Sequence, residues 1–269
     1  AFDNINFHEP GTYVLNGRVS IKEYVWPLIS HRADPDIIYF KGKYYFVATD
    51  EKLQEHLYLR ASDTLEGLAS APDHLILERN LAGDLSGLFW APELHVINGK
   101  LHILFAGSTE SAQPEWWKHV QCRVMELKGD DPTNAANWGN VARIMKKDGV
   151  TPLCNHMGIT LDMTYFEVHG THYYMWSQRE FGGGIHSANL MIASIDPKNP
   201  GKITSDSVLI SKPEYGWERQ GEVNEGPYMI MHDGAIFITF SGSNTDNTYA
   251  VGLLTASANA DLLNPRSWK

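Results

Sequence analysis

Alternating apolar and polar residues form four similar patterns along the chain, each interrupted at its centre by a glycine. The patterns cover residues 34–49, 91–107, 162–178 and 225–242, and their central glycines are Gly42, Gly99, Gly170 and Gly234. β-Branched and aromatic residues flank each glycine, as expected of two strands on either side of a turn. Asn98-Gly99 and Asp233-Gly234 are dipeptides typical of two-residue hairpin turns. The sequence therefore predicts four β-hairpins.

Each predicted hairpin is followed by a second stretch with strand-like alternation. These stretches cover residues 56–68, 122–138, 189–203 and 249–268. The repeating unit is therefore four strands, and a β-propeller is the expected architecture because radial packing of such sheets leaves only short exposed edges. Apolar residues recur at helical spacing nowhere over three turns, which argues against an α/β fold. We expect a single all-β domain over residues 1–269, in which residues 11–21 form a further hairpin that could help to close the ring.

Three of the four hairpins carry a carboxylate at nearly the same distance before the turn. Asp34 and Asp162 precede their turn glycines by eight residues and Glu225 by nine, whereas Ala91 occupies the matching place in the second hairpin. If the first strands line the axis, the three acids converge in one partly desolvated pocket, which is costly unless the charges have a task. Taken singly, each acid could instead serve a turn, because Asp and Glu beside Pro or Gly commonly do.

Glycoside hydrolysis is a reaction that needs such a group of carboxylates. Inverting enzymes use a carboxylic acid to protonate the leaving oxygen and a carboxylate to activate water, with the two groups about 6.5–9.5 Å apart. The axial well of a propeller can hold that separation. Repulsion between neighbouring carboxylates raises a pKa and keeps one member protonated near neutrality. A third carboxylate could tune the acid in this way.

At the start of each predicted blade the sequence resembles glycoside hydrolase family 43. The resembling motifs are Arg32-Ala33-Asp34-Pro35, Trp90-Ala91-Pro92-Glu93, Leu161-Asp162 and Asn224-Glu225-Gly226-Pro227. The resemblance implies a five-bladed β-propeller, of which four blades are readable from residues 32–269. The fifth blade is incomplete or missing in this chain, unless residues 1–31 or a second polypeptide stand in for it. The resemblance also implies that Asp34 is the general base, that Glu225 is the general acid, and that Asp162 raises the pKa of the acid and orients it.

Longer stretches are similar to the branch of this family that comprises exo-1,5-α-L-arabinofuranosidases. They cover residues 211–218, 223–227 and 252–268. The activity implied is the release, with inversion, of terminal α-L-arabinofuranose from α-1,5-linked arabino-oligosaccharides or arabinan. β-Xylosidase and endo-arabinanase activities remain alternatives because those enzymes share the same three acids. A non-catalytic carbohydrate-binding propeller is the alternative from another functional class.

Four further residues are candidates for binding the sugar. Trp90 could offer an apolar face to a sugar ring or pack in the core. Gln178 is expected near the axis, where its amide could bind sugar hydroxyls, and Asn224 beside the proposed acid could do the same. Arg32 could bind a hydroxyl or balance the charge of the three acids. Each of the four could equally have only a structural role.

Composition narrows the range of partners. The net charge of −10 and the pI of about 5.6 argue against a nucleic-acid partner, since the longest basic run is Lys146-Lys147. The sequence contains no apolar stretch of about 18 residues, so no membrane span is predicted.

The chemistry requires no cofactor. A structural metal ion at the axis is possible by resemblance, but the twelve histidines form no ligand-spaced motif. The first ten residues lack the pattern of a secretory signal, and the sequence leaves both the compartment, cytoplasmic or exported, and the oligomeric state open.

Overall fold

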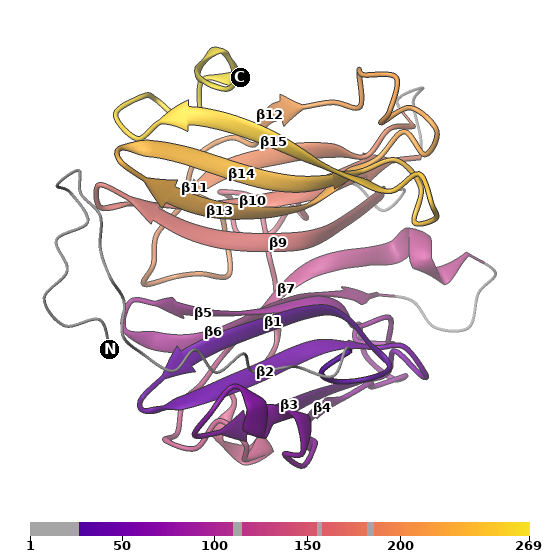
Figure 1. Cartoon of the computed structure of the whole chain (residues 1–269), viewed down its shortest axis with the longest axis vertical. Coiled ribbons are helices and arrows are strands. Elements are labelled where there is room, and N and C mark those ends of the chain that lie inside the picture. Colours follow the sequence, from indigo (N-terminus) through magenta and orange to yellow (C-terminus); the bar gives the residue numbers. More distant parts are fainter. Residues whose placement is uncertain (1–26, 110–114, 155–157, 182–185) are drawn as a thin grey trace, which may run out of the picture.

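The computed structural model describes residues 27–109, 115–154, 158–181 and 186–269. The predicted hairpin at residues 11–21 lies outside these ranges. The described residues form four antiparallel sheets and four short 3₁₀ helices (Figure 1). None of the described helices is long and apolar enough to cross a membrane.

Each of the four predicted hairpins forms the first two strands of one sheet. The first sheet contains β1 (Arg32–Phe40), β2 (Lys43–Asp50), β3 (His56–Ser62) and β4 (His74–Glu78). The second contains β5 (Trp90–Ile97), β6 (Lys100–Ser108), β7 (Val120–Glu126) and β8 (Ala142–Arg143). The third contains β9 (Gly158–Val168), β10 (Thr171–Glu180), β11 (Asn189–Ile195) and β12 (Val208–Ser211). The fourth contains β13 (Asn224–His232), β14 (Ala235–Gly242) and β15 (Ala250–Ser257).

The fourth sheet has three strands where the repeat predicts four. After β15 the chain forms η4 (Pro265–Ser267), in which the side chain of Asn264 accepts a hydrogen bond from the N–H of Arg266. A proline at the start of this turn favours the helical conformation and cannot donate to a strand partner. The other 3₁₀ helices are η1 (Glu66–Ala69), η2 (Trp116–His119) and η3 (Ala135–Asn137).

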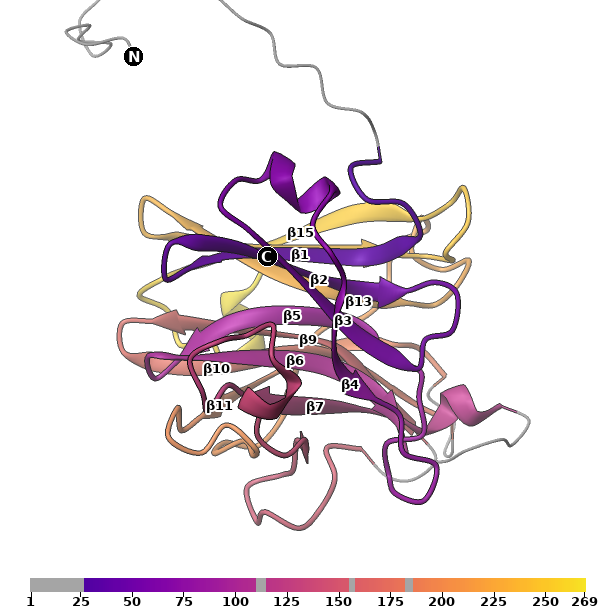
Figure 2. The same cartoon turned by 90° about the horizontal axis from the view of Figure 1, so that it is seen from below.

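The sheets are arranged like the blades of a propeller. Their first strands contact one another in sequence order, β1 with β5, β5 with β9, and β9 with β13. Figure 2 shows these four strands gathered near the middle of the molecule. The described residues form four blades, and the fifth blade expected from the resemblance is not among them.

Three apolar layers hold neighbouring sheets together. Val47 and Leu59 of the first sheet pack with Phe105 of the second. Corresponding layers join the second sheet to the third and the third to the fourth. Each layer is built from alternate residues of its strands, because successive side chains point to opposite faces of a sheet. The alternation noted in the sequence is therefore what holds the blades side by side.

The fourth sheet buries one face and exposes the other. Paired residues of an antiparallel sheet share a face, so the pairing of Met229 with Ile238 and of Ile238 with Leu254 places all three on the side that packs against the third sheet. The opposite face carries Ile230, which is 53% exposed, and Leu253, which is 55% exposed. An apolar face of this kind is unusual in a soluble monomer unless something covers it.

Substitutions of two isoleucines test this assignment of faces. Ile238 is fully buried, and Ile230 lies on the exposed face of the same sheet. We expect Ile238→Ala to lower the free energy of unfolding by about 2–5 kcal/mol, because the substitution leaves a cavity. The matched change Ile230→Ala should alter it by less than about 0.5 kcal/mol. Urea denaturation followed by tryptophan fluorescence measures both, and equal losses would contradict the assignment.

Candidate active site

A β-bulge interrupts the first strand of every sheet. The pairing register shifts between Ala33 and Asp36 in β1, between Trp90 and Glu93 in β5, and between Glu225 and Tyr228 in β13. In the third sheet the register shifts between Leu161 and Thr164 of β9, which pair with Ser177 and Met175 of β10. One residue in each bulge has a positive φ, namely Asp34 (49°), Ala91 (42°), Asp162 (53°) and Gly226 (59°). A bulge of this kind bends the strand and redirects a side chain.

The bulges explain why Glu225 is one residue further from its turn than the two aspartates. Ala33 pairs with Thr49, and Glu225 pairs with Ser241, the corresponding residue of β14. Glu225 therefore occupies the position before the positive-φ residue, whereas Asp34 and Asp162 occupy the positive-φ position itself. Aspartate tolerates this conformation better than most residues do. Two distinct bulge positions thus aim carboxylates at the axis.

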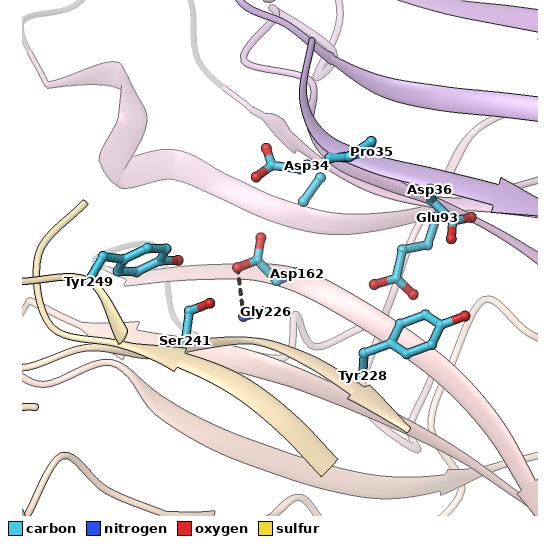
Figure 3. A pocket seen from close by; sticks show the side chains of 10 residues that line it. Asp34, Pro35, Asp36, Glu93, Asp162, Gly226, Tyr228, Ser241 and Tyr249 are labelled. Atoms are coloured by element: carbon cyan, nitrogen blue, oxygen red, sulfur yellow. Dashed lines mark hydrogen bonds between the residues drawn. The ribbon is translucent and has the colours of Figure 1, made fainter. Parts of the chain in front are cut away.

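The three acids lie around one cavity. A cavity of about 610 Å³ is lined by Asp34, Asp162 and Glu225 together with Trp90 and Tyr249. A second cavity of about 430 Å³ shares Asp34, Asp162 and Tyr249 in its wall and is otherwise lined mainly by residues of the first strands (Figure 3). The shared residues place the acids where the two cavities meet. The sequence prediction that these acids lie close together agrees with this arrangement.

Hydrogen bonds fix one oxygen of each of the two aspartates. The Thr49 hydroxyl donates to Asp34 Oδ2 over 2.7 Å, and the same hydroxyl accepts the backbone N–H of Ala91 over 2.9 Å. Asp162 Oδ2 accepts the backbone N–H of Gly226 over 3.0 Å (Figure 3). In both cases a side chain of one blade meets the bulge of another. The positions of the acids therefore depend on how the blades pack.

Burial and mutual repulsion raise the pKa of two of the acids. Burial raises the pKa of Asp162 well above its usual range, and the charges of Glu225 and Asp34 raise it further. Burial also raises the pKa of Glu225, and Asp34 adds to that effect, while the Tyr249 hydroxyl and the charge of Arg179 oppose it. The repulsion between Asp162 and Glu225 is mutual, so the pair binds a proton at a higher pH than two isolated carboxyl groups. Such a pair can supply a general acid near neutral pH.

Trp90 is the predicted sugar-binding residue that the structure brings to the acids. Its indole N–H donates to the side-chain oxygen of Gln54 over 2.8 Å, and both residues line the larger cavity. This hydrogen bond fixes the ring at the wall of the cavity. The ring can then offer a sugar the apolar surface that sugar C–H groups pack against.

The structure places Gln178 away from the acids. Gln178 lies in β10, the second strand of its sheet, and its side chain bonds to Trp176 and Glu180 over 3.1 Å each. It lines a separate cavity of about 350 Å³. The sequence predicted that Gln178 lies near the axis. Gln178 lies instead one strand further out than the acids, because it belongs to β10 and pairs with Thr160 of β9.

Asn224 and Arg32 also do not line the cavity of the acids. Asn224 is fully buried, and its amide donates to Glu218 Oε1 over 3.1 Å. Arg32 forms ion pairs with Asp73 over 2.9 Å and with Asp50 over 3.3 Å. Both residues lie in the paired part of a first strand just before the bulge, where these contacts stabilise the sheet.

Two residues of the site were not expected from the sequence. Thr49 holds Asp34, and the Tyr249 hydroxyl donates to Glu225 Oε1 over 2.8 Å. Counting residues outward from the turn at Gly42 could have placed Thr49 opposite Ala33, directly before the first bulge. Tyr249 follows the irregular turn after β14, so periodicity gives no signal for it.

The described residues contain no group of three or more His, Cys, Asp or Glu side chains that could hold a metal ion. The axial metal implied by the resemblance therefore has no ligand set in this part of the chain. Asp36 and Glu93 line the smaller of the two cavities together with Asp34 and Asp162.

Comparison with known proteins decides the family. Residues 24–269 match the family model described as glycosyl hydrolases family 43. The chain belongs to glycosyl hydrolase family 43. An "Alpha-L-arabinofuranosidase 43" of Humicola insolens is 39% identical over 247 residues, which are 91% of this chain and 48% of that protein. An "Extracellular exo-alpha-(1->5)-L-arabinofuranosidase" of Streptomyces avermitilis is 37% identical over 244 residues, which are 90% of this chain and 47% of that protein.

A solved structure has the same fold as this chain. The crystal structure of an α-L-arabinofuranosidase from Lactobacillus brevis superposes with a TM-score of 0.80 at 35% identity, covering 91% of this chain and 74% of that chain. The family 43 chain described here spans about half the length of the two curated relatives named above.

The raised pKa of the buried pair makes the stability of this family 43 chain depend on pH. The folded pair of Asp162 and Glu225 holds a proton above the pH at which the unfolded chain loses it, so the free energy of unfolding falls as pH rises from about 4 through the folded pKa of the pair. Asp162→Asn removes that charge and keeps an acceptor for Gly226. We expect the variant to match the unsubstituted chain near pH 4 and to become the more stable of the two as pH rises toward 8, because it no longer carries the buried charge.

Urea denaturation at a series of pH values measures this difference. Asp130→Asn is the matched control, because the Asp130 side chain is fully exposed and, among the described residues, forms its ion pair with the exposed Lys41. Its curve should run parallel to that of the unsubstituted chain. A parallel curve for Asp162→Asn as well would contradict the raised pKa of the pair.

Proposed function

We propose that this protein is an inverting glycoside hydrolase that releases terminal α-L-arabinofuranose from α-1,5-linked arabino-oligosaccharides or arabinan. The observation that carries the proposal is the meeting of Asp34, Asp162 and Glu225 on one cavity of about 610 Å³. Membership of family 43 and the printed names of the relatives support it. A cavity of this size suits a small substrate group.

Asp34 is the proposed general base. Its side chain lines the cavity, and its Oδ2 accepts the Thr49 hydroxyl, so Oδ1 is the oxygen to which we assign the binding of water. As the water oxygen attacks the anomeric carbon, Asp34 takes the proton from that water. The bond between the anomeric carbon and the leaving oxygen breaks in the same step. Attack from the side opposite the leaving group inverts the anomeric centre.

Glu225 is the proposed general acid, and Asp162 is the residue that tunes it. Glu225 gives its proton to the leaving oxygen, which prevents a poor leaving group from departing as an alkoxide. Burial and neighbouring charge keep the proton available, since they raise the pKa of Glu225. Asp162 also accepts the Gly226 N–H, so it fixes the backbone immediately after the acid.

Trp90 is the proposed sugar platform. The indole is fixed at the cavity wall by Gln54, which limits the orientations of a bound ring. For Gln178, Asn224 and Arg32 we propose indirect effects on binding, because each is held by contacts outside this cavity. Asn224 is the nearest in sequence to the reacting groups, since it precedes Glu225 directly.

We further propose that a fifth sheet completes the ring by covering the exposed face of the fourth sheet. Val251 on that face is 75% exposed and Leu253 is 55% exposed, and β1 of the first sheet exposes Ile37 at 40% and Tyr39 at 61%. Apolar surface of this extent marks a contact site.

A fluorescent probe of apolar surface tests the fifth sheet. The 269-residue chain should bind 1-anilinonaphthalene-8-sulfonate, and the double variant Val251→Lys, Leu253→Lys should lose most of that binding while its free energy of unfolding changes by less than about 1 kcal/mol. Absence of binding by the unsubstituted chain would show that the 269 residues already cover this face, and would contradict a fifth sheet supplied from outside them.

Replacing the acid tests the reaction. Glu225→Gln keeps the shape but removes the transferable proton, so hydrolysis of arabinotriose should fall by about 10²–10⁴-fold. Hydrolysis of 4-nitrophenyl α-L-arabinofuranoside should fall much less, because 4-nitrophenolate leaves without protonation. Glu222→Gln is the control, since Glu222 is exposed and does not line the cavity of the acids.

Steady-state kinetics with arabinotriose and with 4-nitrophenyl α-L-arabinofuranoside measure both effects. Undiminished arabinotriose hydrolysis by Glu225→Gln would remove Glu225 from the role of acid. Parallel assays with xylobiose and with long-chain arabinan separate the favoured activity from β-xylosidase and endo-arabinanase activities. Binding of arabinotriose without turnover of any of these substrates would favour a carbohydrate-binding propeller.

A further inference from the structure

The hydroxyl of Tyr249 contacts the proposed acid directly. It donates to Glu225 Oε1 over 2.8 Å. Tyr249 lines both cavities that meet at the acids, and Figure 3 shows it among the residues of the smaller one. Tyr249 precedes β15, the third strand of its sheet, whereas Glu225 lies in β13. The contact therefore crosses the sheet at its axial end and is not a by-product of strand pairing.

The turn before Tyr249 is held by its own hydrogen bonds. Asp246 accepts the backbone N–H and the hydroxyl of Thr248 over 2.8 and 2.6 Å, and its carbonyl accepts the N–H of Tyr249 over 3.1 Å. The hydroxyls of Thr248 and Ser243 bond to each other over 3.0 Å. These bonds fix the backbone from which the tyrosine ring projects, so the position of its hydroxyl is set before any substrate binds.

We propose that Tyr249 positions the general acid by holding Glu225 Oε1, so that Oε2 is the oxygen that carries the proton to the leaving group. This inference rests on the proposed function, because it deepens the role given to Glu225. A carboxylic acid can present its proton from either oxygen. A donor fixed on Oε1 makes that oxygen an acceptor and leaves the proton on the other one.

The same hydrogen bond sets how readily Glu225 gives up its proton. A hydroxyl donor binds a carboxylate more strongly than it binds a neutral carboxyl group, so Tyr249 lowers the pKa of Glu225 against the effect of burial. The other charged groups that act on Glu225 are Asp34 from β1, Asp162 from β9 and Arg179 from β10. The two aspartates raise the pKa of the acid, and Arg179 lowers it.

Tyr249 itself stays protonated over the pH range of catalysis. Burial raises its pKa far above the usual value, and the charge of Glu225 raises it further. It therefore remains a donor while Glu225 cycles between acid and carboxylate. The hydrogen bond strengthens as the proton leaves Glu225, which is the moment at which the leaving oxygen is protonated.

Tyr249→Phe tests the proposal because it removes the hydroxyl and keeps the ring. The alkaline limb of the kcat profile for arabinotriose should move up by about one to two pH units, since Glu225 loses the donor that stabilises its carboxylate. Below that limb, kcat should fall by about tenfold or more with a smaller change in KM, because the acid is weaker and less well oriented. Tyr215→Phe is the control, since Tyr215 is 70% exposed and lies outside both cavities.

A purely structural role would not move the limb upward. An unmoved limb, or one that moves to lower pH, would overturn the proposal. Circular dichroism and the urea midpoint of Tyr249→Phe show whether the variant is folded, and Tyr249→His, which offers a donor from a different ring, provides a second variant. Partial return of kcat in Tyr249→His relative to Tyr249→Phe is expected, and no return combined with an unmoved limb would also overturn it.

A titration without substrate separates this inference from the proposed function. Carbon-13 NMR of chain labelled at glutamate carboxyl groups, with Glu225→Gln used to assign the signal, follows the Glu225 pKa directly. That pKa should be higher in Tyr249→Phe than in the unsubstituted chain by about one to two units. If the unsubstituted chain hydrolyses no arabinoside, the proposed function fails, but the titration still decides the role of Tyr249. If the two pKa values agree, the role of Tyr249 fails even when hydrolysis is observed.

Discussion

The whole site depends on a β-bulge with a left-handed residue near the start of each innermost strand. An unbroken strand would send alternate side chains to the two faces of its sheet, into the apolar layers between blades. The bulge breaks that alternation, so that Asp34 and Asp162 point along the axis while the residues after them return to the packing pattern. The same feature lets the fold hold charged groups at its centre without placing them in the layers that stabilise it.

Gathering three carboxylates in one cavity costs stability, and the hydrogen bonds at the bulges offset part of that cost. The Thr49 hydroxyl and the Gly226 N–H each bind one oxygen of an aspartate. The Gly226 contact joins the third and fourth sheets, and the Thr49 hydroxyl joins the first sheet to the second by accepting the Ala91 N–H. The remaining repulsion appears as the raised pKa of Asp162 and Glu225. Catalysis and the loss of stability thus have the same physical origin, as is common at active sites.

The sequence was sufficient for features that repeat and insufficient for features that depend on strand order or on irregular turns. Hairpin periodicity and the shared offset of the acids predicted the blades and the convergence of Asp34, Asp162 and Glu225. The bulge was not foreseen, although the nine-residue distance from Glu225 to its turn glycine, one more than for the two aspartates, reflected the position of Glu225 just before the bulge. Gln178 was expected at the axis, but it lies one strand further out, and the fourth predicted strand of the last sheet is replaced by η4. Tyr249 follows a turn fixed by local side-chain bonds, which no periodic pattern reports.

Proton NMR of arabinotriose during hydrolysis by the 269-residue chain tests the central claim most directly. If Asp34 activates water opposite to Glu225, the first product is arabinose released singly in the β-anomeric form, with the α-anomer appearing only later by mutarotation. Early release of the α-anomer would show retention and would contradict the division of roles between these two carboxylates. Early release of arabinobiose from longer chains would contradict action at the terminal sugar.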